Sequence, residues 1–173
     1  WSPRAMSGEV VTAQELNILF SAARWAPSAY NEQPWRMLYA LRSSPEWQLF
    51  FNLMVEFNQG WTQTAGALVV FMSRKVSSHN GEPLGTHSFD AGAAWQNFCL
   101  QGVSMNLVVH GMSGFDYDRA RKDLQIPDFM QIEAMAAVGR PAPATTLPPP
   151  LRERESPSGR RPITQLVAAG KWS

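Results

Sequence analysis

The sequence predicts a single α+β or α/β sandwich, because helical and strand patterns alternate along a chain with the length of one domain. The chain has 173 residues, and one domain comprises roughly 100–200. From the N-terminus the patterns run helix, strand, helix, strand, helix, strand, helix, strand. No glycine-rich phosphate loop follows any predicted strand, which argues against the two most common nucleotide-binding folds.

Four stretches have the apolar spacing of helices. The first begins with a capping box, T-A-Q-E at Thr12 to Glu15, and ends near Trp25. The second is predicted to begin with Ser44 as its cap and Pro45 at the first helical position. The predicted helices cover residues 12–25, 43–58, 90–106 and 116–125.

Four further stretches have strand character, and one of them, residues 66–73, is a continuous apolar run typical of a strand buried on both faces. The predicted strands cover residues 35–41, 66–73, 107–112 and 132–139. Turn-forming residues predict a surface loop at Ser77 to Ser88. From Arg140 to Pro162 the chain is dense in Pro, Arg, Ser and Thr, which predicts an extended arm without a core of its own.

The composition argues against several classes of partner. A net charge of +1 gives no indication of binding to nucleic acid or to an anionic membrane. No apolar run reaches the roughly 18–20 residues of a membrane span and no signal peptide is visible, so we expect a cytoplasmic protein. Charged residues make up 17% of the chain and hydrophobic residues 45%, which favours a large core together with an oligomer interface.

The reactive residue types form no familiar catalytic or metal-binding pattern. Cys99, the one cysteine, lies in an apolar helical pattern, where a buried and inert thiol is expected. The three histidines lack regular metal-ligand spacing: His79 and His87 are expected to be solvated, and His110 ends an apolar strand from which it could approach a pocket. An enzyme without a nucleophile or a metal takes its chemistry from a cofactor.

The stretch A-P-S-A-Y-N-E-Q-P-W, residues 26–35, places neutral hydrogen-bonding groups between the first predicted helix and the first predicted strand. Ser28, Asn31 and Gln33 offer donors and acceptors, and Pro27 and Trp35 offer rigid apolar walls. These groups suit the flat ring of a flavin, whose carbonyls and nitrogens need neutral partners in a partly apolar slot. The alternative is a tight turn in which the serine and asparagine hydrogen-bond the backbone.

This stretch is similar to the motif A-P-S-x-x-N-x-Q-P-W of the FMN-dependent nitroreductase family and matches it at every fixed position. Other segments resemble the family in the same order and cover nearly the whole chain. W-S-P-R-A-M resembles the opening segment that binds the phosphate and ribityl groups. Residues 87–107 resemble the long central helix, 111–116 the segment that faces flavin N5, and 158–172 the closing stretch that returns a basic side chain to the phosphate.

The resemblance implies which residues bind FMN: Ser2, Arg4, Pro27, Ser28, Asn31, Gln33, Met112, Ser113, Gly114, Arg160 and Arg161. Arginine suits a phosphate because it donates paired charge-assisted hydrogen bonds, so Arg4 and one of Arg160 and Arg161 are expected to converge on it. From the residues alone, the Arg160–Arg161 pair equally fits a solvated turn. The backbone at Ser113 and Gly114 is expected near N5. The family's first phosphate-binding arginine would precede Trp1 and is not in this sequence.

The resemblance also implies an architecture and an activity. The expected fold is one domain over residues 1–173, an α+β sandwich with a mostly antiparallel central sheet. A homodimer would hold FMN at its interface, and an arm of about residues 140–173 would extend to the partner. NAD(P)H would reduce FMN by hydride transfer at N5, and a nitroaromatic, quinone or related conjugated acceptor would then be reduced in a ping-pong cycle.

Three alternatives to a broad reductase remain open at the level of sequence. One is a flavoenzyme of the same family that is dedicated to a single substrate, such as a dehalogenase or a dehydrogenase. Another is a non-catalytic protein that binds or stores FMN. The third is a scaffold without FMN, since the first phosphate-binding arginine is missing from this sequence.

Overall fold

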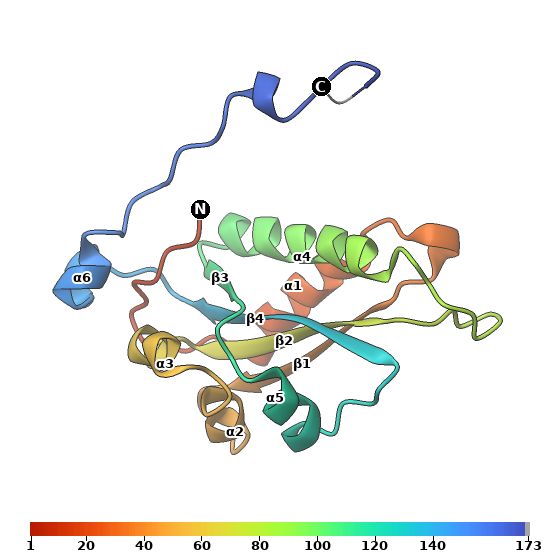
Figure 1. The fold of residues 1–173 in the computed structure, drawn as a ribbon. Helices are drawn as coiled ribbons and strands as arrows, with labels where there is room; N and C mark the ends of the chain where they lie inside the picture. The colour runs from red at the N-terminus through yellow and green to blue at the C-terminus, as the bar shows by residue number, and fades with distance from the viewer. Residues whose placement is uncertain (172–173) are drawn as a thin grey trace.

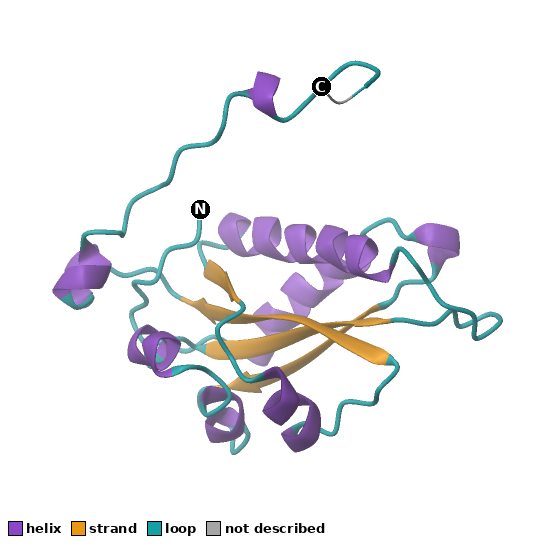
Figure 2. Cartoon of the chain, viewed as in Figure 1, coloured by secondary structure: helices purple, strands orange, loops and turns teal. Residues whose placement is uncertain are grey.

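The computed structural model describes residues 1–171 and shows a four-stranded sheet between two layers of helices (Figure 1; Figure 2). The strands are β1 (Trp35–Leu41), β2 (Ala67–Arg74), β3 (Val108–Met112) and β4 (Met130–Gly139). They lie in the order β1-β2-β4-β3, and every neighbouring pair is antiparallel. The antiparallel pairing confirms the α+β sandwich and rules out the parallel sheet of an α/β fold.

One face of the sheet is covered by α1 (Ala13–Arg24) and α4 (His87–Ser104), which lie above it in Figure 1. Leu16 and Leu19 of α1 and Phe98 of α4 are fully buried against this face. The helix α4 lies very close to β3, because a Cβ atom on Gly102 would come within 2.4 Å of Val109 Cγ2. A glycine at this position therefore allows α4 to sit directly on the strand.

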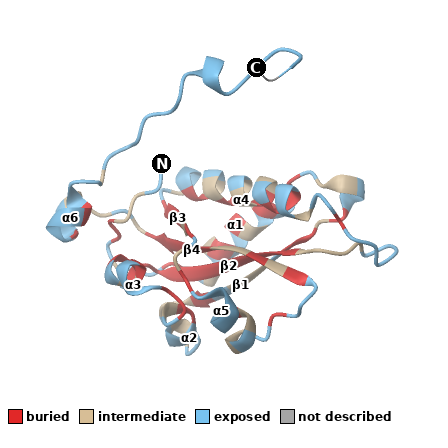
Figure 3. Ribbon diagram, in the orientation of Figure 1, coloured by how far each residue is buried: buried red, intermediate tan, exposed pale blue. Residues whose placement is uncertain are grey.

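The other face is covered by α2 (Trp47–Phe51), α3 (Glu56–Thr62) and α5 (Tyr117–Asp123). Phe50 of α2, Trp61 of α3 and Ala120 of α5 belong to the core on this side. The strand β2 separates the two cores: Val69 packs toward α1 and α4, whereas Val70 packs toward α2, α3 and α5. The predicted burial of this strand on both faces is confirmed (Figure 3).

The start of the chain folds as its local pattern predicts. The Thr12 side chain accepts a hydrogen bond from the Glu15 amide, and the Glu15 carboxylate accepts one from the Thr12 amide, which completes the capping box. The helix α1 then runs to Arg24, with Trp25 as its C-cap.

The single helix predicted over residues 43–58 is wrong. Ser44 and Pro45 lie in a turn, and α2 begins only at Trp47. The chain then leaves the helical conformation between α2 and α3, because the Val55 amide donates to the Gly114 carbonyl (3.1 Å) and Met54 forms a β-bridge with Phe115. A contact with a segment about 60 residues away thus interrupts a locally helical pattern.

The composition predicts an extended arm from Arg140 onward, but the first part of this segment packs against the core of the domain. Two short helices, η2 (Ala144–Thr146) and α6 (Pro149–Arg152), follow β4, and Leu147 and Leu151 are buried in the main core. Beyond residue 155 the chain is exposed and extends away from the domain, with one short turn, η3 (Ile163–Gln165) (Figure 3). The end of the expected arm, residues 172–173, lies outside the described residues.

None of the helices within residues 1–171 is long and apolar enough to cross a membrane.

Candidate functional site

The motif loop, defined here as residues 26–35, joins α1 to β1 and contains the short helix η1 (Ala29–Asn31). The Ser28 hydroxyl accepts a hydrogen bond from the Gln33 amide (3.0 Å), and the Gln33 side chain donates to the Asn31 carbonyl (3.1 Å). Tyr30, Asn31 and Gln33 all have positive φ angles, between 47° and 57°. Ser28 therefore has the backbone role of the tight turn, while the Asn31 side chain points outward from a constrained loop.

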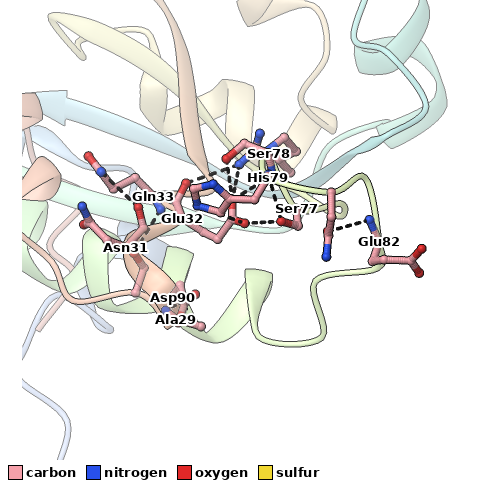
Figure 4. Close-up of polar contacts among 12 residues, drawn as sticks. Ala29, Asn31, Glu32, Gln33, Ser77, Ser78, His79, Glu82 and Asp90 are labelled. Carbon is pink, nitrogen blue, oxygen red and sulfur yellow. Dashed lines mark hydrogen bonds and ion pairs between the residues drawn. The ribbon is translucent and has the colours of Figure 1, made fainter.

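Glu32, at a variable position of the motif, holds this loop in place (Figure 4). Its side chain is 2% exposed and accepts hydrogen bonds from Arg74 (2.6 Å), from the Ser77 hydroxyl, and from the amide (2.9 Å) and hydroxyl (2.8 Å) of Ser78. These bonds, first of all that from Ser77, lower the pKa of Glu32 to about 2. The carboxylate is thus ionised at neutral pH and fastens the motif loop to the segment after β2.

Sequence reasoning missed Glu32 because it weighed only the fixed positions of the motif. A lone acidic residue among neutral and apolar neighbours was the available signal. Asp90 was missed as well: it is buried in the first turn of α4 and accepts hydrogen bonds from the Ala29 amide (3.2 Å) and the Thr86 hydroxyl (3.1 Å). The motif loop is therefore fastened both to α4 and to the segment after β2.

A cleft of about 470 Å³ lies between the first turns of α4, the end of β3 and the adjoining part of β4. We call it the sheet cleft. Its apolar walls are Phe71 and Trp95, and the predicted site residues Ser2, Met112 and Ser113 line it. Its lining residues are Ser2, Phe71, Ser88, Ala91, Gly92, Trp95, Gly111, Met112, Ser113, Glu133 and Ala134. A Cβ on Gly111 would come within 2.8 Å of the Trp95 ring, so glycine is required for Trp95 to occupy this wall.

Gly114 does not line the sheet cleft but fixes the segment that does. Its carbonyl accepts hydrogen bonds from the Asn58 side chain (2.9 Å) and from the Val55 amide (3.1 Å). A Cβ on Gly114 would lie 2.6 Å from Asn58 Nδ2, so the close backbone approach expected of this glycine is to Asn58. Asn58 is buried and was not among the predicted site residues.

The segment that carries Ser2 and Arg4 is held from two sides. His110 Nδ1 lies 2.8 Å from the Pro3 carbonyl, and the Glu155 carboxylate accepts hydrogen bonds from the amides of Arg4 (2.7 Å) and Ala5 (2.8 Å). Burial lowers the pKa of His110, so the ring is neutral at neutral pH and its Nδ1–H donates to Pro3.

The Arg4 side chain is half-buried over the Trp61 ring, with its guanidinium carbon 5.9 Å from the ring centroid. Its Nε is buried and has no hydrogen-bond partner within the described residues. A buried donor without a partner is costly, so this atom is suited to an incoming acceptor.

A second cleft, of about 510 Å³, shares Ser2 and Trp95 with the sheet cleft. Arg160 lines it, whereas Arg161 is exposed and lines neither cleft. Cys99 also lines the second cleft and is half-buried rather than buried, and burial raises the pKa of its thiol to about 12, which disfavours the reactive thiolate.

Two of the three histidines also differ in their surroundings. His79 is exposed, as expected. His87 is half-buried rather than solvated: its ring lies 2.7 Å from the Ser73 hydroxyl and 3.7 Å from the Glu133 carboxylate, because α4 begins there and faces the sheet.

Within one chain, eight of the eleven predicted site residues fall into two groups, and the other three, Arg4, Gly114 and Arg161, line neither cleft. Ser2, Met112, Ser113 and Arg160 line the two adjoining clefts. Pro27, Ser28, Asn31 and Gln33 of the motif loop line neither cleft. In Figure 1, η1 lies near the end of α4 where that helix begins, and the N-terminus lies near the end where it finishes.

The comparisons with known proteins agree on one family. The sequence pattern of the Nitroreductase family matches residues 1–46 and 39–140. An oxidoreductase containing FMN has a crystal structure that superposes with a TM-score of 0.96 at 41% identity, covering 100% of this chain and 89% of that one. The FMN and NADPH-dependent nitroreductase NfnB, as a variant derived from Sphigopyxis sp. strain HMH, superposes with a TM-score of 0.75 at 16% identity, covering 99% and 95%.

A relative in sequence is the uncharacterized 15.4 kDa protein in the ask 5′ region of Mycolicibacterium smegmatis. It is 28% identical over 123 residues, which are 69% of this chain and 80% of that protein. The fold and the match of the family pattern over most of the described residues lead to one conclusion: the chain belongs to the Nitroreductase family.

Proposed function

We propose that the chain is an FMN-dependent oxidoreductase that uses NAD(P)H to reduce nitroaromatic, quinone or related conjugated acceptors. The observation that carries this proposal is the sheet cleft, which joins apolar walls to Met112 and Ser113 at the end of β3. Its volume of about 470 Å³ falls within the roughly 300–1,000 Å³ of small-molecule sites. The similarity to an oxidoreductase containing FMN, at 41% identity over the whole chain, supports the same cofactor here.

The donor set of the site fits FMN. A flat ring needs apolar walls, which Phe71 and Trp95 offer, and neutral hydrogen-bonding groups at its edge, which the backbone at Met112 and Ser113 offers. A phosphate needs cationic donors. The Nε of Arg4 is buried and donates to no acceptor within the described residues, so it suits a phosphate oxygen.

We therefore assign Ser2, Arg4 and Arg160 to the phosphate and ribityl end of FMN, with Arg161 as the alternative to Arg160. Met112, Ser113 and Gly114 belong to the ring end. When bound, FMN supplies two-electron chemistry by accepting a hydride from NAD(P)H and passing it to the acceptor. The chain supplies orientation, a site shielded from water and a fixed backbone at the ring edge.

We further propose that two copies of the chain complete each site. The Pro27, Ser28, Asn31 and Gln33 side chains do not reach the sheet cleft of their own chain, so they fit a role at the site of a partner. The exposed faces of α1 and α4 support an interface, because they carry large apolar side chains. These are Ile18, Phe89, Leu100 and Val103, and Trp25 at the C-cap of α1 adds a further exposed apolar side chain. The exposed apolar residues Ile163, Leu166 and Val167 of the C-terminal arm fit a second contact with the partner.

Steady-state kinetics tests the proposed activity. The FMN-loaded protein is assayed with NADH or NADPH against a panel of quinones and nitroaromatic compounds. A ping-pong reductase gives parallel double-reciprocal lines with several acceptors. Turnover confined to one acceptor indicates the dedicated flavoenzyme, and retained flavin without any turnover indicates the storage protein and contradicts the proposal.

A further inference from the structure

A separate basic pocket of about 600 Å³ lies behind the motif loop, between the end of α1, the start of β1 and the end of β2. We call it the arginine pocket, because Arg24, Arg36 and Arg74 line it together with His79. The Asn31 and Gln33 amides of the motif loop open onto the same pocket. It shares no lining residue with the sheet cleft or the second cleft.

The charges of this pocket do not cancel. Glu32 is its one carboxylate, and that group is occupied by Arg74, Ser77 and Ser78 (Figure 4). The Glu32–Arg74 pair therefore contributes no net charge, and Arg24 and Arg36 leave the pocket with two positive charges. His79 also lines the pocket, with its Nε2 3.7 Å from the Glu32 carboxylate.

Two of the arginines are held in place and still have unused donors. Arg36 donates through one terminal nitrogen to the carbonyls of Gln33 (2.9 Å) and Trp35 (2.7 Å), which leaves its other nitrogens available. Arg74 is fixed by Glu32, and its Nε is buried without a hydrogen-bond partner within the described residues. Fixed guanidinium groups with spare N–H donors are suited to a phosphate, which accepts several charge-assisted hydrogen bonds at once.

We propose that the arginine pocket binds a phosphate group. In the oxidoreductase proposed above, that phosphate belongs to the nicotinamide dinucleotide that donates the hydride, and this second assignment rests on the proposed function. Glu32 of the motif loop would then keep Arg74 in position for the phosphate.

Isothermal titration calorimetry on the purified full chain tests phosphate binding without any need for turnover. The probes are inorganic pyrophosphate, ADP and 2′,5′-ADP, the last of which carries the additional phosphate found in NADPH. The test variant is Arg24→Gln with Arg36→Gln, which leaves the Glu32–Arg74 pair intact. The control is Arg119→Gln, an exposed arginine on α5 outside the pocket.

We expect the wild type and the control to bind pyrophosphate with equal affinity and the double variant to bind it roughly a hundredfold more weakly, since two charge-assisted contacts are lost. Binding should also weaken as the ionic strength rises. Equal affinity in all three proteins, or no binding by the wild type, overturns the proposal.

The source of the phosphate is decided by kinetics on the same proteins. If the phosphate belongs to the nucleotide, the double variant shows a raised KM for NADH or NADPH and an unchanged kcat. Preferential binding of 2′,5′-ADP over ADP in the calorimetry predicts NADPH as the donor. Lost pyrophosphate binding with an unchanged KM overturns the nucleotide assignment alone. Pyrophosphate binding by a protein that shows no reductase activity leaves the pocket standing and contradicts the proposed function.

Discussion

His110 and Glu155 come from distant parts of the chain and hold the same short segment. His110 fixes Pro3, and Glu155 fixes the amides of Arg4 and Ala5. Ser2 lines the sheet cleft and neither His110 nor Glu155 does, so both act on the cleft by holding the segment that carries Ser2 and Arg4. The position of the proposed phosphate-binding arginine therefore depends on a neutral histidine and on a carboxylate from the start of the C-terminal arm.

This arrangement predicts a pH dependence of stability. Burial lowers the pKa of His110 below its ordinary value of 6.5, so below that pH the unfolded chain binds a proton that the native state does not. The contribution of the neutral His110 to the free energy of unfolding is complete above pH 6.5 and is lost as the pH falls toward the lowered pKa of His110. Urea unfolding at pH 8 and pH 5.5 should show a larger fall in the free energy of unfolding for the wild type than for His110→Gln.

The glutamine variant keeps an amide donor for the Pro3 carbonyl and removes the titration. The rest of the chain is the same in both proteins, so its contribution cancels in the comparison. An equal fall in both proteins would show that His110 does not carry the pH dependence.

At the residue scale, the sequence identified hydrogen-bonding side chains more reliably than the residues that they contact. The capping box needed only neighbours three residues apart, and it formed as predicted. For Ser28, both a ligand and a backbone role were open, and the structure shows the backbone bond to Gln33. Glu32 is hydrogen-bonded to Arg74 and Ser78, which lie more than 40 residues further along the chain, and no local sequence pattern predicts such contacts.

At the scale of elements, β3 and α4 are in contact through glycines. Gly102 lets α4 approach Val109, and Gly111 lets Trp95 form a wall of the sheet cleft. These close approaches define the shape of the cleft. We expect the cleft to be more sensitive to volume added at β3 than to volume added at an exposed helix.

Gly111→Ala tests this expectation. The new Cβ would lie 2.8 Å from the Trp95 ring, so the ring must move into the cleft or the strand must shift. We expect a loss of about 1–3 kcal/mol in stability, as for other overpacked sites, together with weaker FMN binding. Urea unfolding and titration with FMN measure the two effects.

The matched control is Gly60→Ala in α3, where a Cβ meets nothing within 4 Å. That change should leave FMN binding unaltered and stabilise the helix by up to about 1 kcal/mol. Weaker FMN binding in the control and not in Gly111→Ala would contradict the assignment of the cleft.

The elements themselves were predicted well where periodicity alone decides. All four strands were found, since β1 to β4 carry apolar runs that suit a sheet with two buried faces. The predicted helix over residues 43–58 failed because Met54 and Val55 pair with the chain after β3. The helix α4 begins at His87, three residues before its predicted start at Asp90, where apolar spacing gave no signal.

At the scale of the whole molecule, a single chain presents the proposed FMN site in two separate parts. The sequence placed the motif loop and the residues at the end of β3 in one site, and the structure shows that they do not line one cleft of one chain. Sequence patterns report which residues suit a ligand but not which copy of the chain supplies them. A two-fold dimer is the simplest arrangement in which both parts meet.

Subunit complementation tests this arrangement. We expect Arg4→Gln and Asn31→Asp each to lose FMN binding. The first variant removes a cationic donor to the phosphate, and the second places a carboxylate at the flavin ring. Aspartate tolerates the positive φ of residue 31, so the backbone of the motif loop is kept. If the two parts come from different chains, random mixing of the variants by refolding restores about one quarter of the sites. Restoration of no sites beyond those of the unmixed variants would place both residues in the site of one chain.

The visible absorption spectrum of the full chain, loaded with FMN, desalted and then treated with NADH or NADPH without oxygen, is the most direct test of the proposed activity. We expect the yellow flavin band to remain after desalting and to bleach when the reductant is added. A band that is lost on desalting, or one that stays oxidised with excess NADH and with excess NADPH, would contradict it.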